Sequence, residues 1–193
     1  MKTELTFCIP AYNYGHYLEQ CLRSVLQSGK EFEVVVLDNG SSDGTQGLRA
    51  IFEADSRVTW FRNEETIPIQ ENWNKAVSLA SSDWVKLLQA DDFILPSAVE
   101  RLLELIRIYA SKDFIGHYAS FVNAEGKITR DQQMHGLLPL SLSGKEALRA
   151  KLRQLYRFKE PSSNLFRKSA WQTVGGYGRD RRFTFDVSFT VRL

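Results

Sequence analysis

Residues 32–45 read Phe-Glu-Val-Val-Val-Leu-Asp-Asn-Gly-Ser-Ser-Asp-Gly-Thr. A run of β-branched and aliphatic residues that ends abruptly in polar residues is typical of a buried strand whose carboxyl end reaches solvent. The Ser-Ser-Asp-Gly-Thr segment that follows predicts a turn into a helix over residues 45–54. This stretch is therefore one complete strand–loop–helix unit of an α/β fold.

The same unit occurs four times in the first half of the chain. Strands are predicted where apolar residues run continuously, over residues 5–9, 32–37, 58–61 and 84–88. Helices are predicted where apolar residues recur every three or four positions, over residues 17–27, 45–54, 72–80 and 96–109. Four such units in series predict an α/β fold with a mostly parallel sheet flanked by helices on both faces.

The second half of the chain is less regular. Its predicted elements are a strand at 114–122, a turn at 124–127, a returning strand at 128–130, a strand at 164–166, a glycine-rich loop at 175–178 and a helix at 186–193. Ser143 and Glu146 have the spacing of a capping box, which predicts a basic helix from this point to about residue 156. No repeat or linker divides the chain, so residues 1–193 are expected to form a single domain.

The composition is that of a globular protein. The chain has 193 residues, of which 43% are hydrophobic and 25% charged. No apolar run approaches the roughly 20 residues that span a bilayer, and the N-terminus does not read as a secretory signal. The two cysteines, Cys8 and Cys21, are too few for a disulfide framework or a cysteine zinc site, so a cytoplasmic location is expected.

Charge is distributed unevenly along the chain. Residues 145–193 contain 12 Lys and Arg against 4 Asp and Glu, a formal charge of +8, whereas the first 144 residues carry −6. Arg149, Arg153 and Arg157 recur every four residues and predict a basic helical stripe. Such a stripe would bind anionic lipid or a lipid-diphosphate acceptor, which would place the protein at the inner face of the cell membrane. The alternative is an ordinary solvated helix face.

Polar clusters follow all four predicted strands. They are Pro10-Ala11-Tyr12-Asn13 after the first, Asp38 to Thr45 after the second, Asn63 after the third, and Asp91-Asp92 after the fourth. In open α/β sheets, ligands bind beyond the carboxyl ends of the strands, so these clusters are expected to form one site.

The sequence lacks the common phosphate-binding loops. Neither Gly-x-Gly-x-x-Gly nor Gly-x4-Gly-Lys-Ser/Thr occurs, which argues against a Rossmann dehydrogenase and excludes a P-loop enzyme. The adjacent carboxylates of Asp91 and Asp92 instead suggest a hard divalent cation, Mg²⁺ or Mn²⁺, that would bridge the protein and a phosphate group.

The candidate residues also have structural interpretations. Asp91 or Asp92 would cap the helix that starts near Pro96. Asp38 would form a turn with Asn39 and Gly40, and a turn is the favoured interpretation of Asp43. Tyr12 would stack on a base, while Asn13 would bind the base edge or cap the next helix. The three histidines lack ligand spacing and are interpreted as structural or surface residues: His16, His117 and His135.

Three blocks of this sequence together resemble the inverting family 2 glycosyltransferases of GT-A fold. They are Phe7-Cys-Ile-Pro-Ala-Tyr-Asn13, Val35-Val-Leu-Asp-Asn-Gly-Ser-Ser-Asp-Gly-Thr45 and Leu87-Leu-Gln-Ala-Asp-Asp92. Pro161-Ser-Ser-Asn-Leu-Phe-Arg167 and Gly175-Gly-Tyr177 resemble the segment that precedes the family's catalytic Glu-Asp pair. The resemblance covers nearly the whole chain.

The resemblance implies roles for nine residues. Those expected at the nucleotide are Pro10, Tyr12, Asn13, Asp38, Asn39, Asn74 and Asp91. Asp92 would hold the metal, and Asp186 would be the general base. The sequence departs from the family pattern at Gln89, which replaces the first Asp of the Asp-x-Asp motif, and at Phe185, which replaces the Glu of the Glu-Asp pair. Family members commonly continue past the position of Leu193, so a truncated or minimal form is expected.

The implied activity is transfer of a sugar from a nucleoside-diphosphate sugar, most often UDP-linked in the family, to an acceptor hydroxyl with inversion. A saccharide or lipid-linked acceptor, in cell-surface polysaccharide or glycolipid synthesis, is expected, and no nucleic-acid partner. Residues 1–110 would form the nucleotide-binding half and residues 111–193 the acceptor and base half. The alternative is a nucleotide-sugar binding or scaffolding module without turnover, which Phe185 and the short C-terminus would suit.

Overall fold

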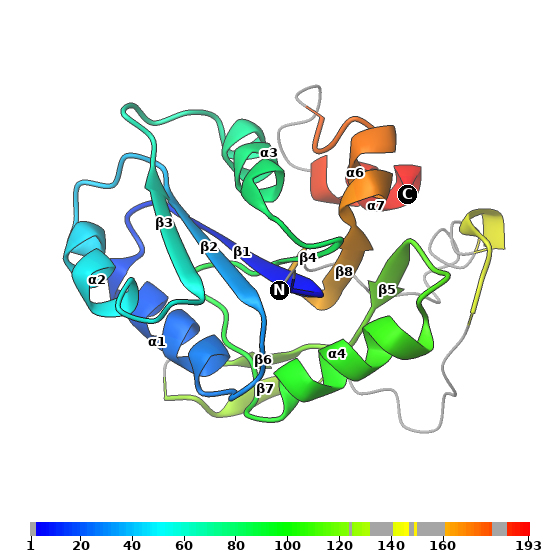
Figure 1. Cartoon of the computed structure of the whole chain (residues 1–193), viewed down its shortest axis with the longest axis horizontal. Helices are drawn as coiled ribbons and strands as arrows, with labels where there is room; N and C mark the ends of the chain where they lie inside the picture. The colour runs from blue at the N-terminus through cyan, green and yellow to red at the C-terminus, as the bar shows by residue number, and fades with distance from the viewer. Residues whose placement is uncertain (1–2, 124, 132–140, 147–148, 150–160, 179–184) are drawn as a thin grey trace.

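The computed structural model describes residues 3–123, 125–131, 141–146, 149, 161–178 and 185–193. Six strands form one mixed sheet in the order β3-β2-β1-β4-β8-β5 (Figure 1). They are β1 (Leu5–Ala11), β2 (Glu33–Asp38), β3 (Val58–Arg62), β4 (Trp84–Leu87), β5 (Phe114–Gly116) and β8 (Asn164–Arg167). The first four are parallel, and β8 runs antiparallel to both β4 and β5.

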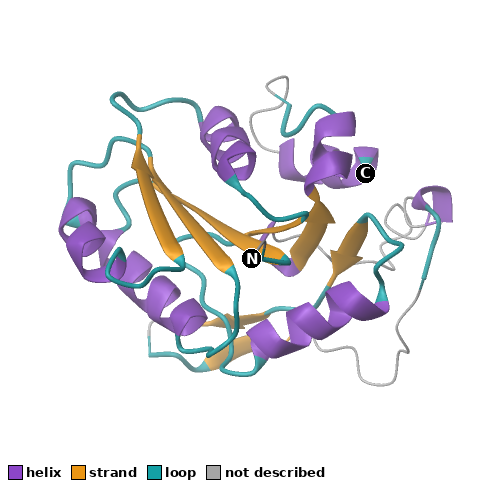
Figure 2. Cartoon of the chain, viewed as in Figure 1, coloured by secondary structure: helices purple, strands orange, loops and turns teal. Residues whose placement is uncertain are grey.

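Helices cover both faces of this sheet (Figures 1 and 2). On one face lie α1 (Gly15–Leu26), α2 (Thr45–Phe52) and α4 (Ala98–Ile108). On the other lie α3 (Ile69–Leu79), α6 (Lys168–Thr173) and α7 (Phe185–Arg192). The prediction of a mostly parallel sheet between two helical layers is confirmed.

The strand sequences explain why two cores form. Successive side chains of a strand point to opposite faces, so a strand buried on both sides is apolar throughout. In β1, Phe7 and Ile9 join the core under α1, α2 and α4, whereas Cys8 joins the core under α3 and α7. In β2, Val34 and Val35 divide between the two cores in the same way.

The prediction of one strand over residues 114–122 is wrong. The chain leaves the sheet after β5, and a separate hairpin follows, made of β6 (Ser120–Val122) and β7 (Ile128–Asp131). All three residues of β6 are exposed, because β5 is the edge strand of the six-stranded sheet and β6 pairs with β7 in a separate two-stranded sheet. The predicted turn and returning strand at 124–130 correspond to this hairpin.

The second half contains one helix that the sequence did not predict and one capping box that it did. The six-residue helix α6 was not predicted, because its length is too short for a periodic pattern. The capping box is confirmed: the Ser143 N–H donates to Glu146 Oε2 at 2.8 Å, and the Glu146 N–H donates to Ser143 Oγ at 3.4 Å. Helix is seen at 144–146 and 149, and the rest of the predicted basic helix lies outside the described residues.

Candidate active site

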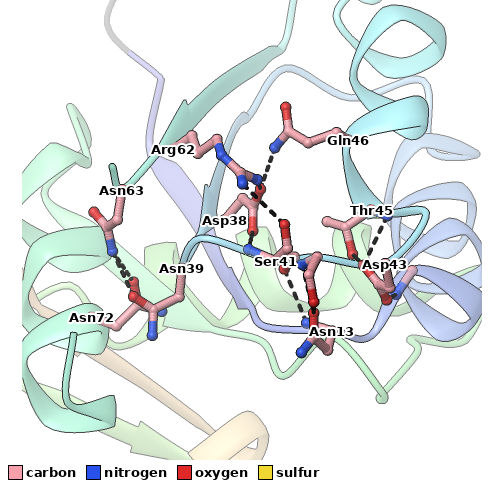
Figure 3. Close-up of polar contacts among 12 residues, drawn as sticks. Asn13, Asp38, Asn39, Ser41, Asp43, Thr45, Gln46, Arg62, Asn63 and Asn72 are labelled. Atoms are coloured by element: carbon pink, nitrogen blue, oxygen red, sulfur yellow. Dashed lines mark hydrogen bonds and ion pairs between the residues drawn. The ribbon is translucent and has the colours of Figure 1, made fainter. Parts of the chain in front are cut away.

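The loops that follow β1 and β2 are joined by hydrogen bonds (Figure 3). The Asn13 N–H donates to Ser41 Oγ at 2.9 Å, and the Ser42 N–H donates to Asn13 Oδ1 at 2.8 Å. Asn13 has a φ of 54°, a left-handed conformation that Asn tolerates better than most residues. Asn13 therefore links two loops that sequence spacing alone places at the same edge of the sheet.

Asp43 makes the second connection between these loops. Its carboxylate accepts from the Gly15 N–H at 2.9 Å and from the Thr45 N–H at 3.0 Å. A Cβ at position 15 would lie 2.9 Å from the Thr45 nitrogen, so this close approach requires glycine. Burial raises the pKa of Asp43, but the hydrogen bonds from Thr45 and Gly15 outweigh it and hold the pKa below its usual value. The turn interpretation of Asp43 is confirmed.

Asp38 is completely buried, and both of its carboxylate oxygens accept hydrogen bonds from the protein (Figure 3). Oδ2 accepts from Arg62 and Gln46, and Oδ1 accepts from the Ser41 N–H at 2.9 Å. These contacts agree with the turn interpretation, and the predicted nucleotide contact of Asp38 stays a prediction. The partners Arg62 and Gln46 were not identified from the sequence.

An amide network lies beside Asp38 (Figure 3). Asn39 is buried; its Oδ1 accepts from Asn63 at 2.7 Å, and its Nδ2 donates to the Ile67 carbonyl at 2.9 Å. Asn63 also donates to Asn72 at 2.9 Å and accepts from Lys75 at 2.6 Å. Asn63, which was predicted at this edge, thus ties β3 to Asn39 and to α3.

Pro10 and Tyr12 occupy different environments at the end of β1. Pro10 is a buried strand residue that pairs with Leu37 of β2. The Tyr12 side chain is 46% exposed at the loop. An exposed ring at this edge is available for stacking on a base.

Asp91 and Asp92 lie in the turn after β4. Asp91 is exposed and Asp92 is half-buried. Burial raises the pKa of Asp92, and the charge of Asp91 acts in the same direction; the Ser162 hydrogen bond and the charge of Lys86 oppose them. The interpretation of either residue as a helix cap is wrong, because the N-cap of α4 is Ser97, with no side-chain cap.

Ser162 connects this turn to the strand β8. It lies in the short 3₁₀ helix Pro161–Ser163 just before β8. Its Oγ accepts from the Gln89 N–H at 3.0 Å, and its side chain hydrogen-bonds Asp92. These contacts bring the Pro161–Arg167 block to the Asp91-Asp92 turn. The carboxylates of Asp91 and Asp92 offer oxygen ligands, which are the kind that Mg²⁺ and Mn²⁺ prefer.

A buried lysine lies below this turn and was missed from the sequence. Lys86 of β4 is completely buried; its Nζ lies 2.7 Å from His117 Nε2 and donates to the Ser162 carbonyl. Burial lowers the pKa of Lys86 to about 7, and burial together with the Lys86 charge lowers that of His117 to about 3. The structural interpretation of His117 is confirmed. The sequence does carry a signal for Lys86, because lysine is rarely buried and this one lies within an otherwise apolar strand.

Lys86 is expected to make stability rise with pH above neutrality. Its pKa drops from an ordinary 10.5 to about 7 on folding, so between these values the unfolded chain holds a proton that the folded chain has released. The free energy of unfolding should therefore increase by up to roughly 1.4 kcal/mol per pH unit over this window, relative to Lys86→Met. Urea unfolding at pH 7, 8 and 9 measures the slope, with exposed Lys127→Met as control. The prediction would be contradicted if the free energy of unfolding changed with pH in the same way for wild type and Lys86→Met.

Asp186 lies in the first turn of α7 and is partly exposed. The other end of this helix is held by Arg192, which donates to the Val174 and Gly176 carbonyls at 2.6 Å each. Phe189 packs on Tyr177, with ring centroids 4.3 Å apart. Asn74, predicted at the nucleotide, hydrogen-bonds the backbone of Tyr177. The general-base role of Asp186 stays a prediction.

Three further predictions concern a metal site, a membrane-spanning helix and the basic stripe, and each can be compared only with the described part of the chain. Within it, no group of three or more His, Cys, Asp or Glu side chains is arranged to hold a metal, which leaves Asp91 and Asp92 as a two-carboxylate candidate. No helix among the described residues is long and apolar enough to cross a membrane. Arg149 is exposed, whereas Arg153, Arg157 and His135 lie outside the described residues.

Comparisons with known proteins agree with this fold. The model of the family described as glycosyl transferase family 2 matches residues 6–175. An uncharacterised protein of Mycobacterium tuberculosis is 30% identical over 208 aligned residues, which cover 100% of this chain and 62% of the relative.

Two solved structures share the fold. Staphylococcus aureus TarS 1–349 in complex with UDP-GlcNAc matches with a TM-score of 0.80 at 19% identity, over 98% of this chain and 52% of that one. The mannosyltransferase PcManGT of Pyrobaculum calidifontis, in complex with GDP-Man and Mn²⁺, matches with a TM-score of 0.66 at 16% identity, over 93% and 49%.

The chain spans between about half and two thirds of these proteins. The family model covers most of the present sequence, including all four strands that carry the candidate site. The expected GT-A fold is likewise confirmed by the structural matches. The chain belongs to glycosyl transferase family 2.

Proposed function

We propose that this chain transfers a sugar from a nucleoside-diphosphate sugar, with UDP as the nucleotide, to an acceptor hydroxyl with inversion. The observation that carries the proposal is the convergence of the loops after β1, β2 and β4 at one sheet edge, with the Asp91-Asp92 turn among them. The UDP-GlcNAc complex of a protein with the same fold supports a nucleotide-sugar donor.

The donor would lie across this edge. The exposed Tyr12 ring would stack on the base, with Pro10, Asn13, Asp38 and Asn39 forming the wall of its pocket. The side chains of Asn13, Asp38 and Asn39 already hydrogen-bond other parts of the protein, so the pocket would be formed before the donor arrives.

The diphosphate would lie at the Asp91-Asp92 turn. Asp91 would accept from a ribose hydroxyl, and Asp92 would hold Mg²⁺ or Mn²⁺, as the Mn²⁺ complex of the mannosyltransferase supports. Such a cation neutralises charge on a departing diphosphate. The hydrogen bond from Ser162 would orient the Asp92 carboxylate toward this role.

The reaction would be a single in-line displacement. The acceptor oxygen would form a bond to the anomeric carbon as the bond from that carbon to the diphosphate oxygen breaks, and the Asp186 carboxylate would take the acceptor proton. Attack from the face opposite the leaving group inverts the anomeric configuration. Residues 1–110 would serve the donor and residues 111–193 the acceptor, which would be a saccharide or a lipid-linked saccharide of cell-surface glycan synthesis at the cytoplasmic face of the membrane.

Calorimetric titration of UDP with and without Mn²⁺ tests the proposal. We expect one site per chain and affinity at least about tenfold higher with Mn²⁺, a gain of about 1.4 kcal/mol. ADP at the same concentrations is the matched control for base recognition. A folded protein that does not bind UDP would contradict the proposal. Binding without turnover of any donor would instead favour a non-catalytic nucleotide-sugar module.

A further inference from the structure

The side chain of Asn74 connects two segments that lie about a hundred residues apart in the sequence. Its Nδ2 donates to the Tyr177 carbonyl at 2.8 Å, and its Oδ1 accepts from the Tyr177 N–H at 2.8 Å. The same Oδ1 accepts from the Trp171 indole N–H at 3.2 Å. The amide therefore pairs with both backbone groups of one residue, as a neighbouring strand would.

Gly176 completes the other side of this contact. It has a φ of 66°, and a Cβ there would lie 2.4 Å from Asn74 Oδ1 and 2.9 Å from Trp171 Nε1. Even alanine would need the Asn74 amide to move and would occupy a backbone conformation that L residues rarely adopt. Asn74 and Gly176 are thus fitted to each other, and the fit holds the turn formed by residues 174–177.

The 174–177 turn also holds α7 in place. Arg192 donates to the carbonyls of Val174 and Gly176, and Phe189 packs on the Tyr177 ring. The Tyr177 ring also meets Trp73 of α3, with centroids 5.3 Å apart. A continuous set of contacts therefore runs from α3 through this turn to α7, whose first turn contains Asp186.

We propose that Asn74 and Gly176 form a lock that positions α7, and with it Asp186, relative to the nucleotide-binding half. The inference rests on the proposed function, because it takes Asp186 as the base. Asn74 is then a positioning residue for the acceptor side of the site. Its oxygen already accepts two protein hydrogen bonds, which leaves no ordinary acceptor capacity for a nucleotide.

The lock predicts a particular kinetic pattern. Asn74→Ala should lower kcat for sugar transfer by roughly 10–100-fold, because a displacement of about 1 Å at a reacting group has an effect of this size. The UDP dissociation constant and the donor KM should stay within about twofold of wild type, since the lock does not touch the donor. Ser78→Ala is the matched control, because Ser78 is exposed one turn further along α3 and, among the described residues, its hydroxyl donates only to the Lys75 carbonyl.

The fit between the two residues predicts coupling. Gly176→Ala alone introduces the clash, whereas Asn74→Ala removes the nearer of the two side chains that the new methyl group would strike and leaves only Trp171 Nε1. The double variant should therefore unfold with a smaller loss of stability than the sum of the two single losses, measured in urea. If Asn74→Ala does not fold, Asn74→Asp keeps both acceptor contacts but sets a carboxylate oxygen against the Tyr177 carbonyl in place of the donated bond, and it should still lower kcat with UDP affinity unchanged.

The results separate this inference from the proposed function. Additive stability losses in the double variant, or Asn74→Ala with unchanged kcat, would overturn the lock. A tenfold weaker UDP affinity with unchanged kcat would make Asn74 a nucleotide contact instead. If the wild type neither binds UDP nor transfers sugar, the proposed function fails, whereas coupled stability losses would still establish the contact between α3 and the 174–177 turn.

Discussion

Asp186→Asn is expected to reduce kcat for sugar transfer by roughly 10²–10⁴-fold, the usual contribution of a positioned general base. Asparagine keeps the size of the side chain and its place in the first turn of α7, but it cannot take the acceptor proton. UDP affinity and stability should stay close to wild type, because α7 is held at Phe189 and Arg192 rather than at Asp186. Steady-state kinetics with a donor that the wild type turns over measures the effect.

The control for this substitution is Asp113→Asn, the same chemical change at an exposed residue before β5. It should leave kcat unchanged. An Asp186→Asn enzyme with wild-type kcat would show that another group takes the proton, and Asp186 would then have no catalytic role. A variant that loses UDP affinity as well would indicate that α7 contributes to the donor site.

Asp92→Ala is expected to abolish the Mn²⁺-dependent part of UDP binding and to lower kcat/KM by about 10³-fold, or about 4 kcal/mol. The half-buried carboxylate would be the direct metal ligand, and no second carboxylate stands at position 89 to replace it. Calorimetry with and without Mn²⁺ measures the first effect, and steady-state kinetics the second.

Asp91→Ala separates the roles of the two neighbouring carboxylates. Loss of the exposed Asp91 should weaken UDP binding to a similar extent with and without Mn²⁺, because it would contact the ribose. If Asp92→Ala retains the full Mn²⁺ effect, Asp92 is not the metal ligand. If Asp91→Ala alone removes that effect, the two assignments must be exchanged.

The first half of the fold could be predicted because its signals are local. The apolar runs of β1 and β2 and the 3.6-residue periodicity of α1 and α4 each lie within a dozen residues. The split of residues 114–122 into β5 and β6 could not be predicted, because both segments have the composition of a strand. Only the position of the sheet, which ends at β5, decides which of them is buried.

The sequence by itself determined the α/β order, the edge of the sheet where the polar loops meet, and the family, because strand ends and motif spacings are properties of consecutive residues. The tertiary structure alone decided which polar groups face each other. The Arg62 partner of Asp38 is 24 residues away, and the Tyr177 partner of Asn74 is 103 residues away. Lys86 likewise meets His117 and Ser162 only across the packed sheet. Hydrogen bonds and charges act over a few ångströms, so their partners depend on how distant segments pack and leave no periodic trace in the sequence.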